Sequence, residues 1–348
     1  MRFVLHRSLL AAFFVAIAGV PSAHAGQADG RLDIYWIDVE GGAATLVVTP
    51  AGESLLFDTG NPGRRDPERI FQTATGVAGL TKIDHLITTH YHGDHYGGAA
   101  TLAQILPIGH VHDNGLFEGI RERPDQEYLD FKAEQRSVLS PGDEIELEPR
   151  PEGNALRVHF RCLAARQQIA PLVEGEGQDN PHCAAATVKP IDISDNANSI
   201  VSLLSFGRFE FFDAGDLTWN VEHDLVCPTN RVGVVDVYQV SHHGLDSSNN
   251  PVLVQALQPT VAVMNNGVTK GCEPYTFATL KETPSIQAIY QLHRNRREDA
   301  HNNTADEFIA NQEEACQAGY IKLSVDPTGE TYTVSIPGTG HEATYRTK

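Results

Sequence analysis

Residues 88–98 of this 348-residue chain read Thr88-Thr89-His90-Tyr91-His92-Gly93-Asp94-His95-Tyr96-Gly97-Gly98, with three histidines and a carboxylate within six positions. The apolar run at residues 83–87 predicts a short buried strand, which would place these side chains in the loop after it. Neutral imidazoles and a carboxylate suit Zn²⁺, with Mn²⁺ or Fe as alternatives. His90 and His92 can face the same way, whereas the adjacent Asp94 and His95 diverge, so the spacing predicts two neighbouring metal ions. The competing interpretation is a solvated, histidine-rich loop.

The segment His90-Tyr91-His92-Gly93-Asp94-His95 resembles the His-x-His-x-Asp-His signature of the metallo-β-lactamase superfamily of hydrolases. The resemblance implies an α/β fold, a four-layer αββα sandwich with two sheets face to face and helices outside. It also implies metal ligands on loops at one edge of the sandwich. A zinc-bound hydroxide would be the nucleophile. Asp94 would bind metal and also orient this hydroxide.

Two upstream segments extend this resemblance. Residues 37–44, Ile37-Asp38-Val39-Glu40-Gly41-Gly42-Ala43-Ala44, are similar to the Asp-Val-Gly-Gln-Gly-Asp-Ala segment of the branch that includes the hydrolase domain of competence DNA-uptake proteins. Asp58, in Leu56-Phe57-Asp58-Thr59-Gly60, resembles the superfamily aspartate that supports the ligand loop by hydrogen bonds. An ordinary turn-forming aspartate is the alternative for Asp58.

Downstream, the resemblance implies that Asp216 is a bridging ligand, because it follows a predicted strand hairpin in Asp213-Ala214-Gly215-Asp216. A carboxylate has two oxygens and can join two cations. Many superfamily members place a further histidine before this hairpin, where the present chain has Asn196 and Asn198. The first metal would then have fewer protein ligands, and Asn196 would either bind weakly through its amide oxygen or hold a water.

The last implied ligand comes from Ser241-His242-His243-Gly244, after the buried run at residues 232–240. We assign His242 as the ligand and His243 as a proton donor or phosphate contact, with the reverse assignment and a solvated histidine pair as alternatives. The complete predicted ligand set is then His90, His92, Asp94, His95, Asp216 and His242.

The amino terminus resembles a secretory signal. Arg2 and Arg7 precede an apolar run at residues 8–20, and Ala23-His24-Ala25 fits an Ala-x-Ala cleavage site. Removal of residues 1–25 would leave an exported, periplasmic or extracellular protein. A membrane anchor is the alternative, although the run is short for a span.

Composition limits the partners. The formal net charge of −19 argues against a broad nucleic-acid-binding surface, because such surfaces neutralise phosphates with Lys and Arg. We therefore expect a small-molecule or phosphoester substrate. The basic residues Arg294, Arg296 and Arg297 are interpreted as one solvated helix face, with a phosphate contact as the alternative.

We expect residues 26–348 to form a single domain, with an irregular insertion at about 164–191 that lies over the site and a helical and hairpin tail at 268–348. An exported chain permits disulfides, and we predict the pairs Cys162–Cys183 and Cys272–Cys316. His110 and His112 mimic the ligand pair, but no acidic residue follows them at ligand spacing, so we interpret both as surface histidines.

These features predict an exported zinc-dependent hydrolase of a phosphodiester or small phosphoester. The first alternative is a lactonase, amidase or β-lactamase-like hydrolase of a carbonyl substrate. The second is a non-catalytic protein that binds metal or a cell-wall ligand.

Overall fold

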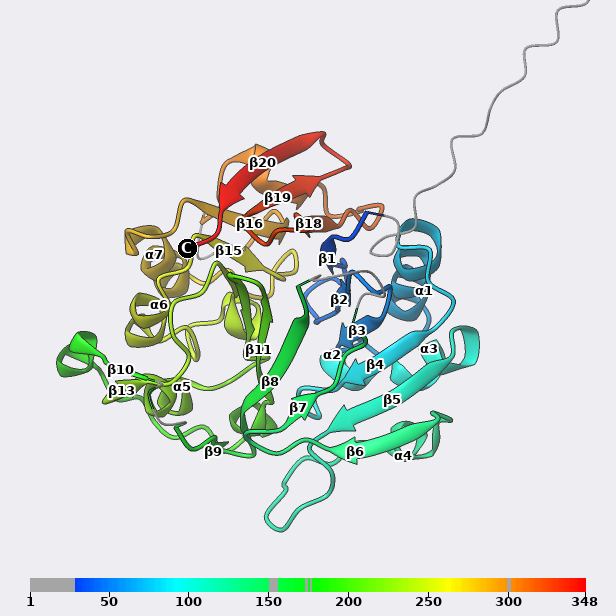
Figure 1. Ribbon diagram of the computed structural model, residues 1–348, viewed down its shortest axis with the longest axis horizontal. Helices are drawn as coiled ribbons and strands as arrows, with labels where there is room; N and C mark the ends of the chain where they lie inside the picture. The colour runs from blue at the N-terminus through cyan, green and yellow to red at the C-terminus, as the bar shows by residue number, and fades with distance from the viewer. Residues whose placement is uncertain (1–28, 150–155, 173–174, 176, 299–301) are drawn as a thin grey trace, which may run out of the picture.

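The computed structural model describes residues 29–149, 156–172, 175, 177–298 and 302–348. The predicted signal peptide, residues 1–25, lies outside the described residues, and its cleavage remains a prediction. Two large sheets face one another, with helices on both outer faces (Figure 1).

The first sheet holds nine strands. From edge to edge they are β20 (His341–Arg346), β19 (Thr331–Ile336), β18 (Ile321–Val325), β1 (Leu32–Trp36), β2 (Thr45–Val48), β3 (Ser54–Phe57), β4 (Ile83–Ile87), β5 (Ile108–Asp113) and β6 (Gln135–Val138). Strands β3 to β6 are parallel, whereas the other neighbours in this sheet are antiparallel.

The second sheet is also mixed. Its order is β17 (Ile309–Asn311), β16 (Ala288–His293), β15 (Val261–Met264), β14 (Val237–Gln239), β12 (Phe209–Asp213), β11 (Val201–Phe206), β8 (Val158–Ala165) and β7 (Glu144–Ile145), and β9 (Gln168–Ile169) pairs with β8. A separate two-stranded sheet joins β10 (Gln178–Asp179) to β13 (Thr229–Asn230).

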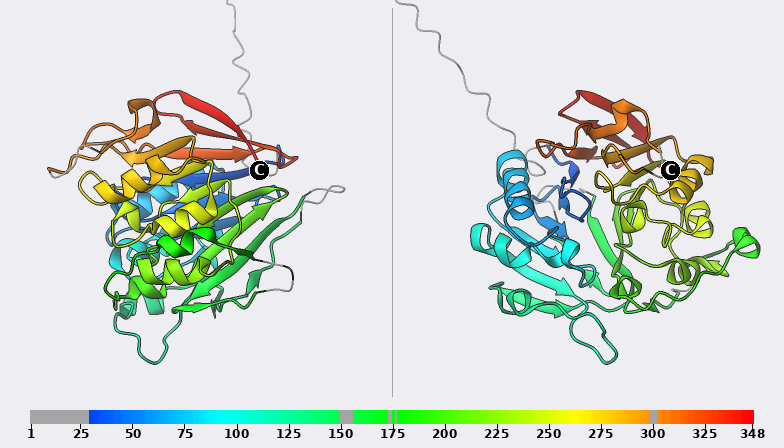
Figure 2. Two further views of the ribbon diagram at one scale, coloured as in Figure 1. Left: turned by 90° about the vertical axis from the view of Figure 1, so that its left-hand side faces the viewer. Right: turned by 180° about the vertical axis from the view of Figure 1, so that it is seen from behind.

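The helices form the outer two layers, as the rear view in Figure 2 shows. Over the first sheet lie α1 (Arg65–Phe71), the π-helical turn η1 (Gln72–Val77), α3 (Ala99–Ile105) and α4 (Gln126–Asp130). Over the second lie α5 (Trp219–Val226), α6 (Pro251–Leu257) and α7 (Pro274–Glu282). The remaining short helices are α2 (Gly93–Tyr96), η2 (Pro181–Ala185), η3 (Asp195–Asn198), η4 (Ser241–Gly244) and η5 (Asp306–Phe308).

Strand β1 shows why the sandwich has four layers. Its alternate residues Ile34 and Trp36 enter the core between the sheets, whereas Tyr35 enters the core between the first sheet and its helices. All five residues of the strand are buried, so both faces are covered. The predicted α/β four-layer architecture is confirmed.

The tail differs from its prediction. The helical and hairpin tail predicted at residues 268–348 does contain α7 and the β18–β19 hairpin, but strands β16 and β17 lie between them and extend the second sheet. The run at residues 288–293 is wholly buried, as a central strand requires. Arg294, Arg296 and Arg297 follow β16 and form ion pairs with Asp306, Glu313 and Glu273, so the predicted helix face is wrong.

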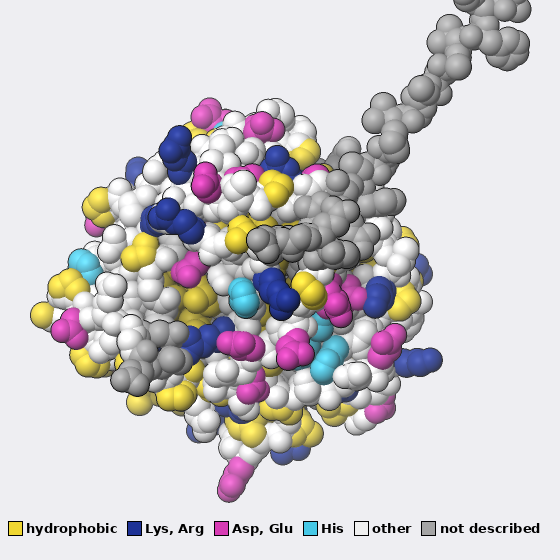
Figure 3. All heavy atoms as spheres, viewed as in Figure 1, with side chains coloured by type: hydrophobic (Ala, Val, Ile, Leu, Met, Phe, Trp, Pro, Cys, Tyr) yellow, Lys and Arg dark blue, Asp and Glu magenta, His cyan; other side chains and the backbone are white. Residues whose placement is uncertain are grey.

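Acidic, basic and apolar side chains are interspersed on the face seen in Figure 3. Within the described ranges, no helix has both the length and the apolar composition needed to cross a bilayer.

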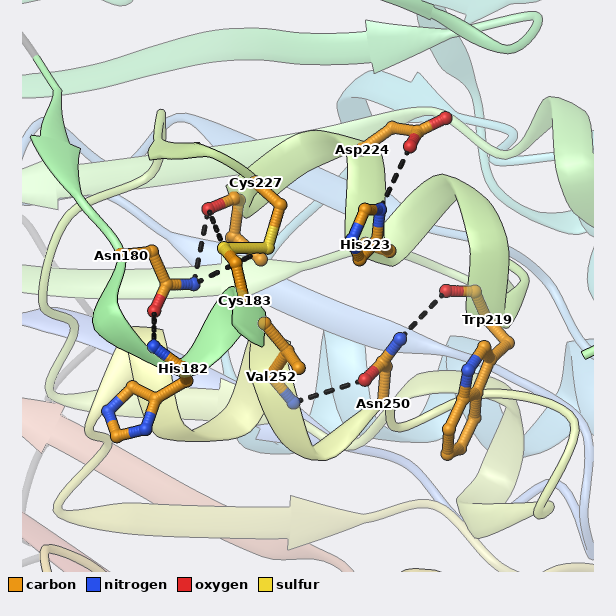
Figure 4. Close-up of a disulfide and its surroundings, with 10 residues drawn as sticks. Asn180, His182, Cys183, Trp219, His223, Asp224, Cys227, Asn250 and Val252 are labelled. Atoms are coloured by element: carbon orange, nitrogen blue, oxygen red, sulfur yellow. Dashed lines mark hydrogen bonds and ion pairs between the residues drawn. A yellow bond between two sulfur atoms is a disulfide. The ribbon is translucent and has the colours of Figure 1, made fainter. Parts of the chain in front are cut away.

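Helix η2 of the predicted insertion packs on the helices that cover the second sheet. Helix η2 contacts α6, and Cys183 forms a disulfide with Cys227 at the end of α5 (Figure 4). Asn180 supports this junction, since its side-chain amide donates to the Val226 carbonyl (3.1 Å) and accepts from the His182 backbone N–H (3.0 Å).

Both predicted disulfide pairs are therefore wrong. Cys162, Cys272 and Cys316 are free thiols. Cys162 lies in the core between the sheets, whereas Cys183 packs on the helical side of the second sheet, so the sheet separates the predicted partners.

The disulfide should stabilise the chain because it closes a long loop, with a sequence separation of 44 residues. The double change Cys183→Ser and Cys227→Ser should lower the free energy of unfolding by about 2–4 kcal/mol, measured by urea unfolding. A reducing agent should lower the stability of the unaltered protein and leave the double variant unchanged. Equal stability of the oxidised protein and the double variant would contradict this role.

Candidate metal centre

The candidate site lies where parallel strands of both sheets end. Strands β3 and β4 are parallel neighbours in the first sheet, and β12 and β14 are parallel neighbours in the second. Asp58 follows β3, and the histidine loop with α2 follows β4. Asp216 follows β12, and η4 follows β14. The carboxyl ends of parallel strands meet at one edge, which brings these distant segments together.

Four side chains converge there: Asp94, His95, Asp216 and His243. His95 Nε2 lies 3.1 Å from Asp216 Oδ2, 3.2 Å from His243 Nε2 and 3.6 Å from Asp94 Oδ2. His243 Nε2 lies 3.3 Å from Asp94 Oδ2 and 3.6 Å from Asp216 Oδ2. Ligands at zinc-bond length around a tetrahedral ion are about 3.3 Å apart. The four donor atoms thus have the spacing of a tetrahedral metal site.

A second set, His90, His92 and Asp216, shares the Asp216 carboxylate. His90 Nε2 lies 3.9 Å from Asp216 Oδ2, and the two histidine ring centroids are 4.8 Å apart. His90 is fully buried, and its Nε2 has no hydrogen-bond partner among the described residues. A buried ring nitrogen without a partner is costly, and a cation would satisfy it. These residues therefore fit a second ion.

The structure places the two consecutive histidines differently, and the ligand assignment of His242 stays a prediction. His243 joins the four-residue set, whereas His242, predicted as the ligand, belongs to neither set. Both residues have left-handed backbone, with φ of 53° and 55°. This tight turn, rather than the alternation of an extended strand, sets the directions of the two rings. His242 Nε2 remains close, at 3.4 Å from Asp216 Oδ2.

Hydrogen bonds orient the rings of His95 and His243. Asp58 accepts from Thr89 through the backbone N–H (2.8 Å) and the hydroxyl (2.7 Å), and its Oδ2 lies 2.7 Å from His95 Nδ1. His243 Nδ1 lies 3.3 Å from the Asn265 carbonyl oxygen. In both rings the contact at Nδ1 directs Nε2 toward Asp216, the arrangement that metal-binding histidines usually adopt.

Asn196, predicted to bind weakly or to hold a water, lies beside His242. Its Nδ2 is 3.4 Å from His242 Nε2, and its Oδ1 is buried without a partner among the described residues. Asn198 instead donates to Asp195, which accepts from the Tyr91 backbone N–H. The first asparagine thus faces the site, while the second supports the histidine loop.

Two glycines let neighbouring backbone approach this loop. A Cβ on Gly42 would lie 2.5 Å from the Asp94 carbonyl oxygen, and one on Gly98 would lie 2.2 Å from the Thr59 carbonyl oxygen. The Ala43 backbone N–H donates to the Asp94 carbonyl (3.1 Å). The segment at residues 37–44 therefore packs directly on the predicted ligand loop.

Comparisons with known proteins agree with this geometry. Residues 37–161 match the family described as the metallo-beta-lactamase superfamily. Recombination protein 2 of Haemophilus influenzae is 25% identical over 260 residues, which cover 74% of this chain and 26% of that protein. The competence protein ComA of Neisseria gonorrhoeae is 24% identical over 253 residues, which cover 73% of this chain and 29% of that protein. Residues 37–161 are therefore similar to the metallo-β-lactamase superfamily.

The predicted resemblance to the competence-type branch is confirmed by these matches. A UPF0173 metal-dependent hydrolase of Cupriavidus metallidurans is 36% identical over 93 residues, covering 25% of this chain and 29% of that protein. The chain thus spans only 26% to 29% of the length of these relatives.

Charge interactions in the candidate centre shift the pKa values of its residues in the direction opposite to burial. Burial raises the pKa of Asp94 and of Asp216, but the neighbouring histidines outweigh it and hold both values well below the usual range. Burial lowers the pKa of His95 and of His243, but Asp216 outweighs it and raises both. A divalent cation bound here would replace the protons on these two rings.

Two polar residues that the sequence analysis missed lie beside the candidate centre. Lys270 forms an ion pair with Asp94 Oδ2, and its side chain is 38% exposed. It therefore lies between the candidate centre and solvent, a position called the mouth of the site below. Glu122 contacts His92 Nε2. Neither belongs to a recognisable motif, and Lys270 is 176 residues away from Asp94 in the chain. Only the folded structure reveals them.

Removal of the shared carboxylate should cost metal at both positions. We expect Asp216→Ala to lose at least half of the divalent metal that the unaltered protein binds, because Asp216 belongs to both ligand sets. Metal content per chain would be measured by mass spectrometry after equilibration with Zn²⁺. Asp224→Ala, which removes a 69% exposed carboxylate on α5, is the matched control. Unchanged metal content in the Asp216 variant would refute the bridging assignment.

Proposed function

We propose that the chain is a metal-dependent hydrolase that uses two divalent ions to cleave a phosphodiester or a small phosphoester. Zn²⁺ is the first candidate for these ions. The observation that carries this proposal is the Asp216 carboxylate shared by two unequal ligand sets. The set with four protein donors has no need of a further ligand. The set with three protein donors leaves one position for water or substrate, which distinguishes a catalytic site from a structural one.

Divalent ions at such sites make water nucleophilic near neutral pH and polarise a phosphoryl or carbonyl oxygen. The side chains would divide the remaining work. Asp94 directs Oδ2 toward His95 and His243, which leaves its second oxygen to orient the attacking water. His243 is fully buried within the four-donor set, so we propose it as a ligand.

His242 takes the role of substrate contact in this proposal. Its Nε2 faces Asp216 at 3.4 Å, and its Nδ1 lies 3.0 Å from Ser247 Oγ. The ring is 11% exposed, so a substrate oxygen could reach it from the mouth. Asn196 beside it would hold the leaving group or a water.

Lys270 supports an anionic substrate. Its ammonium group pairs with Asp94, but a cation bound by Asp94 would repel it and make it available for a phosphate oxygen. The net charge of −19 limits the proposal to a small ester rather than long nucleic acid. We also propose that the protein acts after export, on the basis of its first 25 residues, and the mass of the secreted chain would test this.

A substrate screen tests the reaction class. The zinc-loaded protein should hydrolyse bis(p-nitrophenyl) phosphate faster than a lactone or a chromogenic cephalosporin. A chelator should abolish turnover, and added Zn²⁺ should restore it. If metal is bound and no ester, lactone or lactam reacts, the hydrolase proposal fails. If the lactone or the cephalosporin reacts fastest, the hydrolase proposal holds and the phosphoester assignment fails.

Lys270→Ala tests the charge of the substrate. We expect the KM for the phosphodiester to rise about tenfold with kcat little changed, because one charge-assisted contact worth about 1.5 kcal/mol is lost. Lys270→Arg should retain most of the affinity, and Lys281→Ala, at an exposed lysine on α7, should have no effect. Equal losses on the charged phosphodiester and a neutral ester would rule out a phosphate contact by Lys270.

A further inference from the structure

Three histidines outside the candidate metal centre gather on one face of the first sheet. His85 of β4 pairs in register with His110 of the parallel strand β5, and His112 lies two residues further along the same strand. Residues two apart face the same side of a sheet, so the three rings lie together. The ring centroids of His110 and His112 are 4.0 Å apart, and those of His85 and His112 are 5.3 Å apart.

The ring nitrogens have the spacing of metal ligands. His85 Nδ1 lies 3.1 Å from His112 Nε2, close to the spacing of about 3.3 Å between two imidazole nitrogens on a tetrahedral zinc ion. One ligand atom from each of the three histidines lies within 4.8 Å of the others. His110 Nε2 is buried and has no hydrogen-bond partner among the described residues, so it is available to bind an ion.

The opposite ring nitrogens are already oriented by other groups. His85 Nε2 lies 3.0 Å from Glu53 Oε1, and His112 Nδ1 lies 3.1 Å from Ser137 Oγ. A carboxylate on the outer nitrogen of a histidine fixes the ring and makes the inner nitrogen a better ligand. Glu53 is itself held, because its Oε2 accepts from the Glu148 backbone N–H (2.7 Å).

The cluster is enclosed but reachable. His112 is 5% exposed, whereas the side chains of His85 and Glu53 are each 13% exposed. Histidine side chains reach the surface near β3 and β4 on the face seen in Figure 3. An ion could therefore enter from solvent, and water could complete its coordination.

We propose that His85, His110 and His112 form an additional binding site for a divalent transition-metal ion, Zn²⁺ first, with Glu53 as the positioning residue for His85. Imidazole donors select ions of this kind rather than Mg²⁺ or Ca²⁺. The site shares no residue with the two ligand sets around Asp216. The proposed site contains residues of β4, β5 and the turn before β3. A bound ion would therefore cross-link these strands of the sheet that carries the histidine loop.

The prediction that both His110 and His112 are surface histidines is wrong for His112, which is buried. The expected acidic residue does not follow them in the chain. Glu53 instead precedes β3 and reaches them through His85, which is 32 residues away from it.

Zinc titration of the full chain carrying Asp216→Ala tests the proposal, because this variant lacks the carboxylate shared by the two ligand sets of the candidate metal centre. Asp216→Ala should retain one bound Zn²⁺ per chain at this site, and the double variant Asp216→Ala with His112→Ala should lose it. In the Asp216→Ala background, Glu53→Gln should weaken that remaining binding by about 10–100-fold. His159→Ala, which removes an exposed histidine on β8, is the control and should change nothing. Zn²⁺ should also raise the Tm of the Asp216 variant but not of the double variant.

Equal zinc binding by the single and double variants would overturn the proposal, as would no binding by a folded Asp216→Ala variant. If His112→Ala prevents folding, His110→Asn in the same background replaces it, and unchanged zinc affinity there would overturn the proposal. Phosphoester hydrolysis by His112→Ala should match that of the unaltered protein. Loss of the histidine site and failure of the proposed hydrolase are thus separate outcomes.

Discussion

The Asp216 carboxylate is the group on which the candidate centre depends. It is almost completely buried, yet three histidine nitrogens lie within 3.1–3.6 Å of it, from His95, His242 and His243. A buried carboxylate is tolerated only with compensating positive charge or metal coordination. The histidines supply that compensation from both sheets, so the charge of one residue links the two halves of the sandwich at its edge.

The two sheets bring together, at this edge, segments that are far apart in the sequence. Asp58 at the end of β3 holds both Thr89 and His95, and the Asp94 carbonyl accepts from Ala43. The close approach of Gly42 and Gly98 leaves no space for a side chain at these positions. The ligand loop is therefore enclosed by backbone on two sides, which limits movement of its side chains and keeps the donor atoms close to coordination spacing.

The two candidate ligand sets differ in their number of protein donors and in their neighbours. The four-donor set is closed around Asp216, while the three-donor set lies beside His242 and Asn196. Lys270 adds a cation at the mouth in a chain that is strongly acidic as a whole. A local positive group within an acidic protein supports the proposed small anionic substrate, since the wider field repels long polyanions.

The sequence by itself determined the fold class, the candidate ligand loop and most of the residues that gather around it. Those features are local: the spacing of His90 to His95, the strand before them, and short motifs at Asp58 and Asp216. The position of His243 rather than His242 in the four-residue cluster, the disulfide partner of Cys183, and the neighbours of His110 and His112 depended on the tertiary structure. The physical reason is that a left-handed turn redirects adjacent rings, a sheet separates cysteines that are close in sequence, and strand pairing brings His85 and Glu53 to residues far along the chain.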